Sequence, residues 1–275
     1  MNIERIAGRG RLIVAVALLA VTAACASAPR GVVPAGTSEP DKYLFDKGTD
    51  ALKNKKYLTA REFFKQVTET YTQSTYRPDA KLGIGDTYIG EGTSEGLVLA
   101  INEFREFLSF YPTNPRADYA QYKIAMAHFK QMRAAQRDQT ETRDAIKEFD
   151  TFVARYPNSK LLPEVQAKLR EAHDRLSEAS YLVGFFYYKQ QKWYPGAIDR
   201  FKSVLKDDPE YTGRDAVYFC LADSLTKVRR EAEALPYLEK LVAEFEKSEY
   251  LVPAQKKIVE LKSAAPPAPV KSSGG

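Results

Sequence analysis

The sequence contains little of what metal chemistry or covalent cross-linking requires. Among its 275 residues are two cysteines and two histidines. Two cysteines can form one disulfide at most, so the chain is not a disulfide-stabilised scaffold. On a helix, neither His128 nor His173 has a second metal-ligating side chain three or four positions away. No metal site and no cofactor are therefore expected.

Motifs that carry catalysis are also scarce. The glycine-rich segment 90–96 connects two expected helices, whereas a phosphate-binding loop follows a strand and carries a Lys-Ser or Lys-Thr pair. No pair of carboxylates stands out in a loop or an apolar segment. Cys220 lies in an apolar stretch that disfavours the thiolate, so a buried and unreactive thiol is expected there. We expect no catalytic residue and no enzymatic activity.

Charge of one sign does not accumulate in long blocks. The chain has 41 Lys and Arg residues against 36 Asp and Glu residues. Without residues 1–24, which hold three arginines and one glutamate, 38 basic and 35 acidic residues remain, a formal charge of +3. A nucleic-acid interface requires a clustered basic face, so binding to DNA or RNA is not expected.

A long apolar run occurs only at the amino terminus. Three arginines precede a mostly apolar run over residues 12–24, which is too short to span a bilayer comfortably. Residues 1–24 thus resemble a lipoprotein signal peptide. They end in small residues before Cys25, which in bacterial lipoproteins becomes the acylated amino terminus. Thr22 stands where Leu is usual, so an ordinary signal with a chance cysteine stays an alternative.

Acyl chains on Cys25 would anchor the chain, because each buried methylene contributes about 0.8 kcal/mol. Ala26 follows the cysteine in place of Asp, which by resemblance to bacterial lipoproteins favours the outer membrane. Residues 25–40 are rich in Pro, Gly and small residues, and we expect a flexible tether there. The predicted location is the periplasmic face of the outer membrane.

The chain does contain a repeated helical pattern. An Ala is followed by Phe or Leu four residues later and by another apolar residue at the seventh position, and three of the copies have Pro at the twelfth. These offsets place the three apolar side chains on one helix face, and the proline ends the helix. The copies begin at Ala60, Ala100, Ala145, Ala197 and Ala234. An enlarged polar loop, residues 131–142, interrupts the third copy, and either partner contacts or simple solvation would explain it.

This spacing resembles the tetratricopeptide repeat, in which about 34 residues form two antiparallel helices. The resemblance covers about residues 41–262 and implies an all-α fold, a right-handed superhelical solenoid of about five tetratricopeptide-like helix pairs plus a carboxy-terminal capping helix. We divide it into amino-terminal repeats 1–3, residues 41–158, and carboxy-terminal repeats 4 and 5, residues 159–262. The second part includes a long linking helix from about 160 to 190 and the cap. Residues 263–275 have the composition of a disordered tail.

Several segments resemble one lipoprotein family more specifically. Residues 111–122, 155–159, 168–181 and 186–189 closely resemble the BamD (ComL) family of outer-membrane lipoproteins. The resemblance implies a non-catalytic scaffold of the β-barrel assembly machinery. It implies three kinds of partner: a BamA-like barrel subunit bound by the carboxy-terminal repeats, other lipoproteins of the machinery, and unfolded outer-membrane proteins received by the amino-terminal repeats.

Two candidate contacts come from that resemblance. Tyr71 aligns with the Tyr of the family's Arg-Tyr-Pro and is assigned to substrate binding, although Thr72 replaces the proline. Arg200 matches a family arginine on the partner-facing fourth repeat and is assigned to the BamA-like subunit. Core packing for Tyr71 and plain solvent exposure for Arg200 are the competing interpretations. Glu103 stands where the family often has a basic residue, which leaves the mode of signal binding open.

A different periplasmic adaptor is the alternative function. A tetratricopeptide lipoprotein that coordinates envelope division or regulates peptidoglycan hydrolases would share the fold and the anchor. The family-like segments favour the assembly machinery, and identification of the bound partners would separate the two hypotheses.

Overall fold

The computed structural model describes residues 33–264, and every regular element in that range is helical. The signal peptide, Cys25 and the tail from residue 265 lie outside the described residues. The elements are α2 (Pro40–Lys53), α3 (Tyr57–Thr70), α4 (Arg77–Glu91), α5 (Ser94–Phe110), α6 (Ala117–Gln131), α7 (Thr140–Arg155), α8 (Leu162–Phe186), the π-helical turn η2 (Tyr187–Gln191), α9 (Tyr194–Asp207), α10 (Arg214–Lys227), α11 (Glu231–Glu244) and α12 (Leu251–Ala264).

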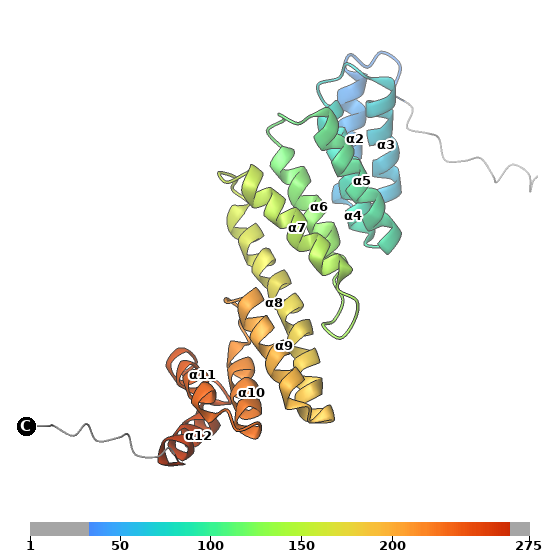
Figure 1. Cartoon of the computed structure of the whole chain (residues 1–275). Helices are drawn as coiled ribbons and strands as arrows, with labels where there is room; N and C mark the ends of the chain where they lie inside the picture. The colour runs from blue at the N-terminus through green and yellow to red at the C-terminus, as the bar shows by residue number, and fades with distance from the viewer. Residues whose placement is uncertain (1–32, 265–275) are drawn as a thin grey trace, which may run out of the picture. The chain divides into compact units, whose positions relative to one another are not determined.

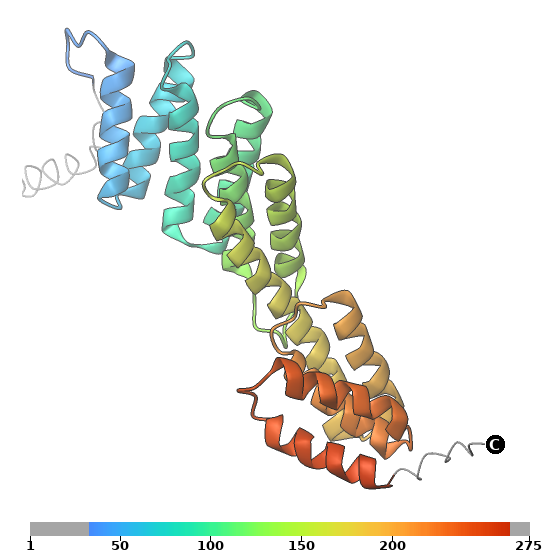
Figure 2. The ribbon, with the colours of Figure 1, turned by 90° about the vertical axis from the view of Figure 1, so that its left-hand side faces the viewer.

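The chain forms two compact units that divide between Thr93 and Ser94, and each is described by itself. In the first, α3 packs against both α2 and α4 (Figure 1). In the second, each helix from α5 to α11 packs against the next, and α12 covers α11 at the end of the chain (Figure 2). The all-α fold of stacked helix pairs is thus confirmed for the described residues. The expected pair of α4 and α5 spans the division and stays a prediction, as does the grouping into repeats 1–3 and 4–5.

The Ala and Phe ladder holds each helix pair together. The five ladder alanines and Phe104, Phe149 and Phe201 have no solvent-exposed surface. Two of the ladder rings, Phe64 and Phe201, lie against a glycine of a neighbouring helix. A Cβ atom on Gly83 would lie 2.6 Å from the Phe64 ring, and one on Gly184 would lie 2.8 Å from the Phe201 ring. The helices can approach this closely because glycine has no side chain at these two positions.

A serine in the loop after each of three helix pairs fastens that loop to the start of the pair. Ser74, Ser159 and Ser248 each donate a 2.6 Å hydrogen bond to an aspartate in the first turn of the pair's first helix. The aspartates are Asp41, Asp118 and Asp215. Each serine oxygen also accepts a backbone N–H two residues further on. The same serine–aspartate hydrogen bond therefore joins the end of three different helix pairs to their start. In the first pair, the hydrogen bond from Ser74 is the main reason that the pKa of Asp41 lies below its usual value.

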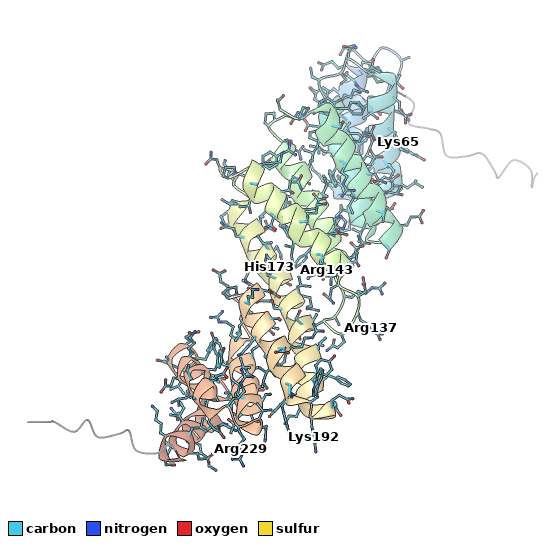
Figure 3. The ribbon with its side chains drawn as sticks, in the orientation of Figure 1. Lys65, Arg137, Arg143, His173, Lys192 and Arg229 are labelled. Atoms are coloured by element: carbon cyan, nitrogen blue, oxygen red, sulfur yellow. The ribbon has the colours of Figure 1, made fainter. Side chains whose placement is uncertain are left out.

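Three helix pairs reverse direction through a left-handed residue. Lys55, Lys192 and Arg229 have φ angles of 58°, 49° and 63°, and each lies five residues before a ladder alanine. Lys192 and Arg229 are labelled in Figure 3. The next backbone N–H then bonds back to the end of the preceding helix, as when Arg230 N–H donates to the Leu225 carbonyl at 2.9 Å. In the turn before α9 the corresponding bond runs from Trp193 to Tyr187 and spans one residue more, because η2 is a π-helical turn.

The expected long linking helix is present as α8 and its continuation η2. The π-helical turn has a packing consequence, because Tyr188 on η2 donates a 2.9 Å hydrogen bond to Asp223 on α10. Lys257 on α12 donates to the same carboxylate. Asp223 is therefore a buried junction between η2, α10 and the capping helix.

A second buried carboxylate fixes α8 against the end of α9. Asp208 accepts hydrogen bonds from the Arg170 guanidinium, one of them at 3.0 Å, and a 2.6 Å hydrogen bond from Ser177. Burial alone would raise the pKa of Asp208, but these donors more than offset it and hold the pKa below its ordinary value.

Candidate functional site

Arg200 lies on α9 with its side chain exposed. Its guanidinium forms no hydrogen bond or ion pair with another described residue, whereas Lys202 two positions on pairs with Glu233 at 3.1 Å. The Cβ atom of Arg200 lies next to Gly184 of α8, at the same close approach that admits the Phe201 ring. Phe201 therefore fixes the helix against α8 while Arg200 remains available to an external anion.

Exposed apolar side chains lie at the same end of the α8–α9 pair. Val183, Phe186 and Trp193 are 41%, 47% and 54% exposed, although all three are large and apolar. Trp193 packs edge-on against Tyr187 with ring centroids 5.2 Å apart, so the indole is held in place and not free to swing. We call Val183, Phe186, Trp193 and Arg200 the α8–α9 surface. Exposed aromatic residues and an unpaired arginine are typical of the composition of protein-binding surfaces.

Tyr71 lies directly after α3 and is half buried. Its backbone is bonded at both ends, since its N–H donates to Val67 at 3.2 Å and its carbonyl accepts from Ser74 at 2.9 Å. Tyr111 and Tyr156 follow α5 and α7 in the same way and pack on Phe107 and Phe152, with centroids 5.3 and 5.5 Å apart. An aromatic residue at this position thus has a structural role in other pairs, and Tyr71 keeps both of its competing interpretations.

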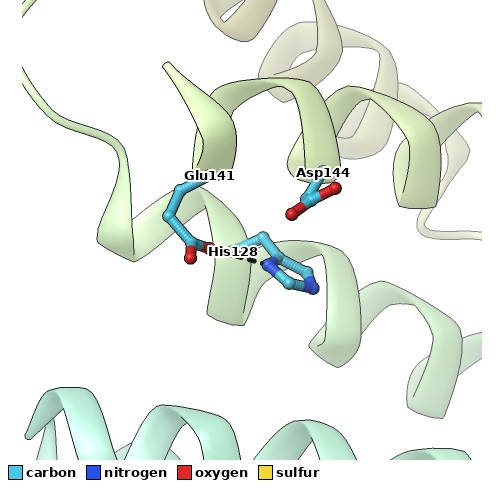
Figure 4. Close-up of side chains that lie close together, drawn as sticks. All are labelled: His128, Glu141 and Asp144. Atoms are coloured by element: carbon cyan, nitrogen blue, oxygen red, sulfur yellow. Dashed lines mark hydrogen bonds and ion pairs between the residues drawn. The ribbon is translucent and has the colours of Figure 1, made fainter. Parts of the chain in front are cut away.

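Within the described residues, one group of side chains could hold a metal ion. His128 on α6 and Glu141 and Asp144 on α7 have ligand atoms that all lie within 4.8 Å of one another (Figure 4). His128 Nδ1 is already hydrogen-bonded to Glu141 at 2.8 Å, whereas its buried Nε2 has no hydrogen-bond partner among the described residues. Arg137 in the adjoining loop and Arg143 in the first turn of α7 add positive charge (Figure 3). We assign no metal to this cluster, which joins the two ends of the enlarged loop.

Neither of two other reactive-looking features forms a catalytic arrangement. The segment from Gly92 to Gly96 has the Gly-x-Ser-x-Gly spacing of a nucleophile elbow, but an elbow connects a strand to a helix, and here α4 precedes it. Cys220 is buried, as expected, and burial raises the pKa of its thiol to about 11. A thiol of that pKa is a poor nucleophile at neutral pH.

Residues 37–227 match the family described as YfiO, outer membrane lipoprotein. The match covers more than half of the chain. The chain belongs to the YfiO family of outer-membrane lipoproteins. Among the described helices, none is both long enough and apolar enough to cross a membrane.

Curated relatives of the chain carry the name BamD, the family that several of its sequence segments resemble. The outer membrane protein assembly factor BamD of Caulobacter vibrioides is 28% identical over 229 residues, which cover 82% of this chain and 73% of the relative. BamD of Haemophilus influenzae is 26% identical over 231 residues, covering 79% and 85%. A solved structure similar to the chain, the TPR2AB domain of yeast Sti1 with pHSP90, has a TM-score of 0.44 and 16% identity and covers 82% of this chain and 83% of that one. The family match and the two curated relatives confirm the resemblance to the BamD family.

The sequence alone predicted only part of the α8–α9 surface. It named Arg200 but not Phe186 or Trp193, because an apolar residue on a solenoid helix is usually buried and no periodicity distinguishes the exposed ones. The polar insertion of η2 after Tyr188 was a usable signal, since Lys189-Gln-Gln-Lys192 cannot continue a buried helix face.

Proposed function

We propose that the chain is a non-catalytic scaffold that assembles proteins into the outer membrane. The observation that carries the proposal is the family match over residues 37–227, together with relatives named as outer membrane protein assembly factors. A fold of stacked helix pairs supports it, because such folds present extended surfaces to partner proteins.

The scaffold is proposed to be held at the periplasmic face of the outer membrane by acyl chains on Cys25. The family description as lipoproteins and the small residues before this cysteine support the anchor. Mass spectrometry of the mature amino terminus tests it: a triacylated Cys25 is expected, and an unmodified terminus at another residue would contradict it.

The α8–α9 surface is proposed to bind the barrel-forming BamA-like subunit. Its support is the exposed and unpaired Arg200 on α9, together with the exposed aromatic rings of Phe186 and Trp193 on the same helix pair. A guanidinium at the rim of an interface contributes through complementary charge, and aromatic rings contribute through burial.

Replacing Arg200 by Glu is expected to weaken binding to that subunit about tenfold, because an attractive pair becomes a repulsive one. Binding is measured by biolayer interferometry with the purified partner, at low and high salt. Lys160→Glu, an exposed cation far along the chain from α9, is the matched control and is expected to leave the affinity within about twofold. Equal affinity of the Arg200→Glu variant would remove Arg200 from the interface.

Tyr71 is proposed to contact unfolded outer-membrane proteins. Its support is its half-exposed ring at the end of α3 and the alignment with the family's Arg-Tyr-Pro. A photo-crosslinking residue at position 71 is expected to capture a peptide with an outer-membrane protein's carboxy-terminal signal several-fold more than one at Tyr111. Equal capture at the two positions would leave Tyr71 a packing residue.

The whole proposal is tested by a mild-detergent pull-down of the tagged protein from its own envelope, followed by mass spectrometry. A BamA-like subunit in near-equal amount is expected, with other lipoproteins of the machinery. Recovery of division or cell-wall proteins in its place would favour the alternative of a different periplasmic adaptor.

A further inference from the structure

A cleft of about 830 Å³ lies in the second unit, away from the α8–α9 surface. It is lined by α9 on one side and α11 on the other, and by the start of α10. Its size falls in the range of ligand sites, about 300–1,000 Å³, and far exceeds that of a single inorganic anion. We call it the α9–α11 cleft.

The cleft is strongly cationic. Lys202, Lys206, Arg214 and Lys240 line it with one carboxylate, Glu244, which gives a formal charge of +3. Arg214 lies 3.6 Å from Glu244, and Lys202 is paired with a glutamate outside the lining. Lys206 and Lys240 are exposed and form no ion pair with any residue that the structure describes. Two ammonium groups on facing helices are therefore unsatisfied by the protein itself.

Two tyrosines lie between these cations. Tyr218 of α10 and Tyr237 of α11 stack with ring centroids 6.2 Å apart and an angle of 30° between the ring planes. Tyr218 is only 7% exposed and also packs on Phe245, so its ring is held in place. A fixed aromatic floor suits the apolar atoms and the backbone of an extended peptide.

The repeat provides an internal comparison for this cleft. The surface between α5 and α7 has the same framework, because Ala100 and Ala197 are equivalent ladder residues and Asp118 and Asp215 make the same serine contact. There, Gln121 donates to the carboxylate of Glu148 at 2.7 Å and to its backbone carbonyl at 3.1 Å. The Glu148 carboxylate is further paired with Arg105 at 3.0 Å. The polar groups of that surface satisfy one another.

In the α9–α11 cleft the same framework positions carry different chemistry. Tyr218 and Tyr237 stand where the first surface has Gln121 and Glu148. Three positions are basic in the cleft and uncharged on the first surface. Lys206 corresponds to Ser109, Arg214 to Ala117 and Lys240 to Thr151. The fold therefore does not require these cations or this aromatic pair, since an equivalent framework forms without them.

We propose that the α9–α11 cleft binds an extended acidic segment of a partner protein. The carboxylates of the segment pair with Lys206 and Lys240, and its backbone lies over the tyrosine floor. Charge complementarity selects this occupant, because a cleft of formal charge +3 with two unpaired ammonium groups attracts anions and repels basic segments. The site is independent of Arg200, which lies on the face of α9 that meets α8.

The test uses the whole mature chain in detergent and a labelled ten-residue peptide of Glu and Gly with one central Tyr. Fluorescence anisotropy is expected to show binding that weakens with added salt. The double variant Lys206→Glu/Lys240→Glu is expected to bind about tenfold more weakly. Lys147→Glu/Lys160→Glu changes the net charge equally at two exposed lysines outside the cleft, and its affinity is expected to stay within about twofold.

Three outcomes would overturn the proposal. Equal weakening in both double variants would reduce the binding to an effect of net charge. Equal binding of the same peptide with Gln in place of Glu would remove the role of the carboxylates. If the unaltered chain unfolds at its normal thermal midpoint but does not bind the acidic peptide, the cleft is not a site for acidic segments.

Discussion

Replacing Phe149 by alanine is expected to lower the free energy of unfolding by about 3–5 kcal/mol. The ring has no exposed surface and belongs to a cluster with Ala125 of α6, Phe152 of α7 and Val165 of α8. It also meets Phe129 edge-on, with ring centroids 6.0 Å apart. Three helices thus converge on one side chain, and its removal leaves a cavity that none of them can fill alone.

Urea unfolding followed by far-ultraviolet circular dichroism measures this effect. Asp150→Ala changes the next, exposed residue of the same helix and is expected to move the midpoint little. Stacked repeats often unfold in more than one step, so the transition that contains α6–α8 is the one to compare. An unmoved midpoint in Phe149→Ala would mean that the ladder is not what holds the pairs together.

The second large effect is expected at Asp223, where Asp223→Ala should cost about 3–5 kcal/mol. The carboxylate accepts hydrogen bonds from Lys257 and Tyr188, and its side chain is only 11% exposed. Its loss leaves a mostly buried ammonium group without a partner and releases the capping helix from α10. Measured by urea unfolding, the carboxy-terminal transition is therefore expected to shift to lower urea.

Low pH is expected to have a similar effect in the unaltered protein. Burial raises the pKa of Asp223, but the hydrogen bond and charge of Lys257, with the hydrogen bond of Tyr188, outweigh it and lower the pKa below the ordinary value. A lowered folded-state pKa contributes stability above the unfolded pKa of about 3.9, and this stability is lost as the pH falls through the folded-state value. Acid unfolding of the capping region should therefore begin below about pH 4.

A double variant separates the charge pair from the packing. Asp223→Leu/Lys257→Met removes both charges and is expected to be more stable than Asp223→Ala, because no unpaired charge remains. If Asp223→Ala were as stable as the unaltered chain, the junction between η2, α10 and α12 would contribute nothing to the fold.

The core of the fold was predictable from the sequence because it depends on a local period. Ala145 and Phe149 are four residues apart, and that spacing alone places them on one helix face. All the ladder residues named from this pattern are buried in the structure. The long linking helix was also predictable from local sequence, because no strong helix-breaking residue interrupts it.

Contacts between helices were not predictable in this way. His128 was judged by its neighbours three and four residues away, whereas Glu141 lies across the enlarged loop on the next helix. Ser159 similarly donates a hydrogen bond to Asp118, which lies at the other end of the helix pair in the sequence. These partners follow from how the helices pack, and no spacing within one helix specifies them.

The two candidate partner surfaces were found in different ways. Arg200 came from a family resemblance, and its exposure is what the structure adds. Lys206 and Lys240 are ordinary lysines in the sequence, and they stand out only because Ser109 and Thr151 occupy the equivalent positions of another pair. Trp193 was missed because an exposed tryptophan has no pattern that marks it.

The π-helical turn η2 has a consequence for how this chain can change in evolution. It holds one residue more than an α-helical turn, and the closing bond from Trp193 to Tyr187 accommodates the addition locally. The ladder residues of α9 therefore keep their position against α8, although the π-helical turn makes the preceding segment one residue longer than an α-helical turn would. We therefore expect relatives to gain or lose a residue at this point without a change in the neighbouring repeats, and we expect an alignment of their repeats to place its gap within residues 187–191.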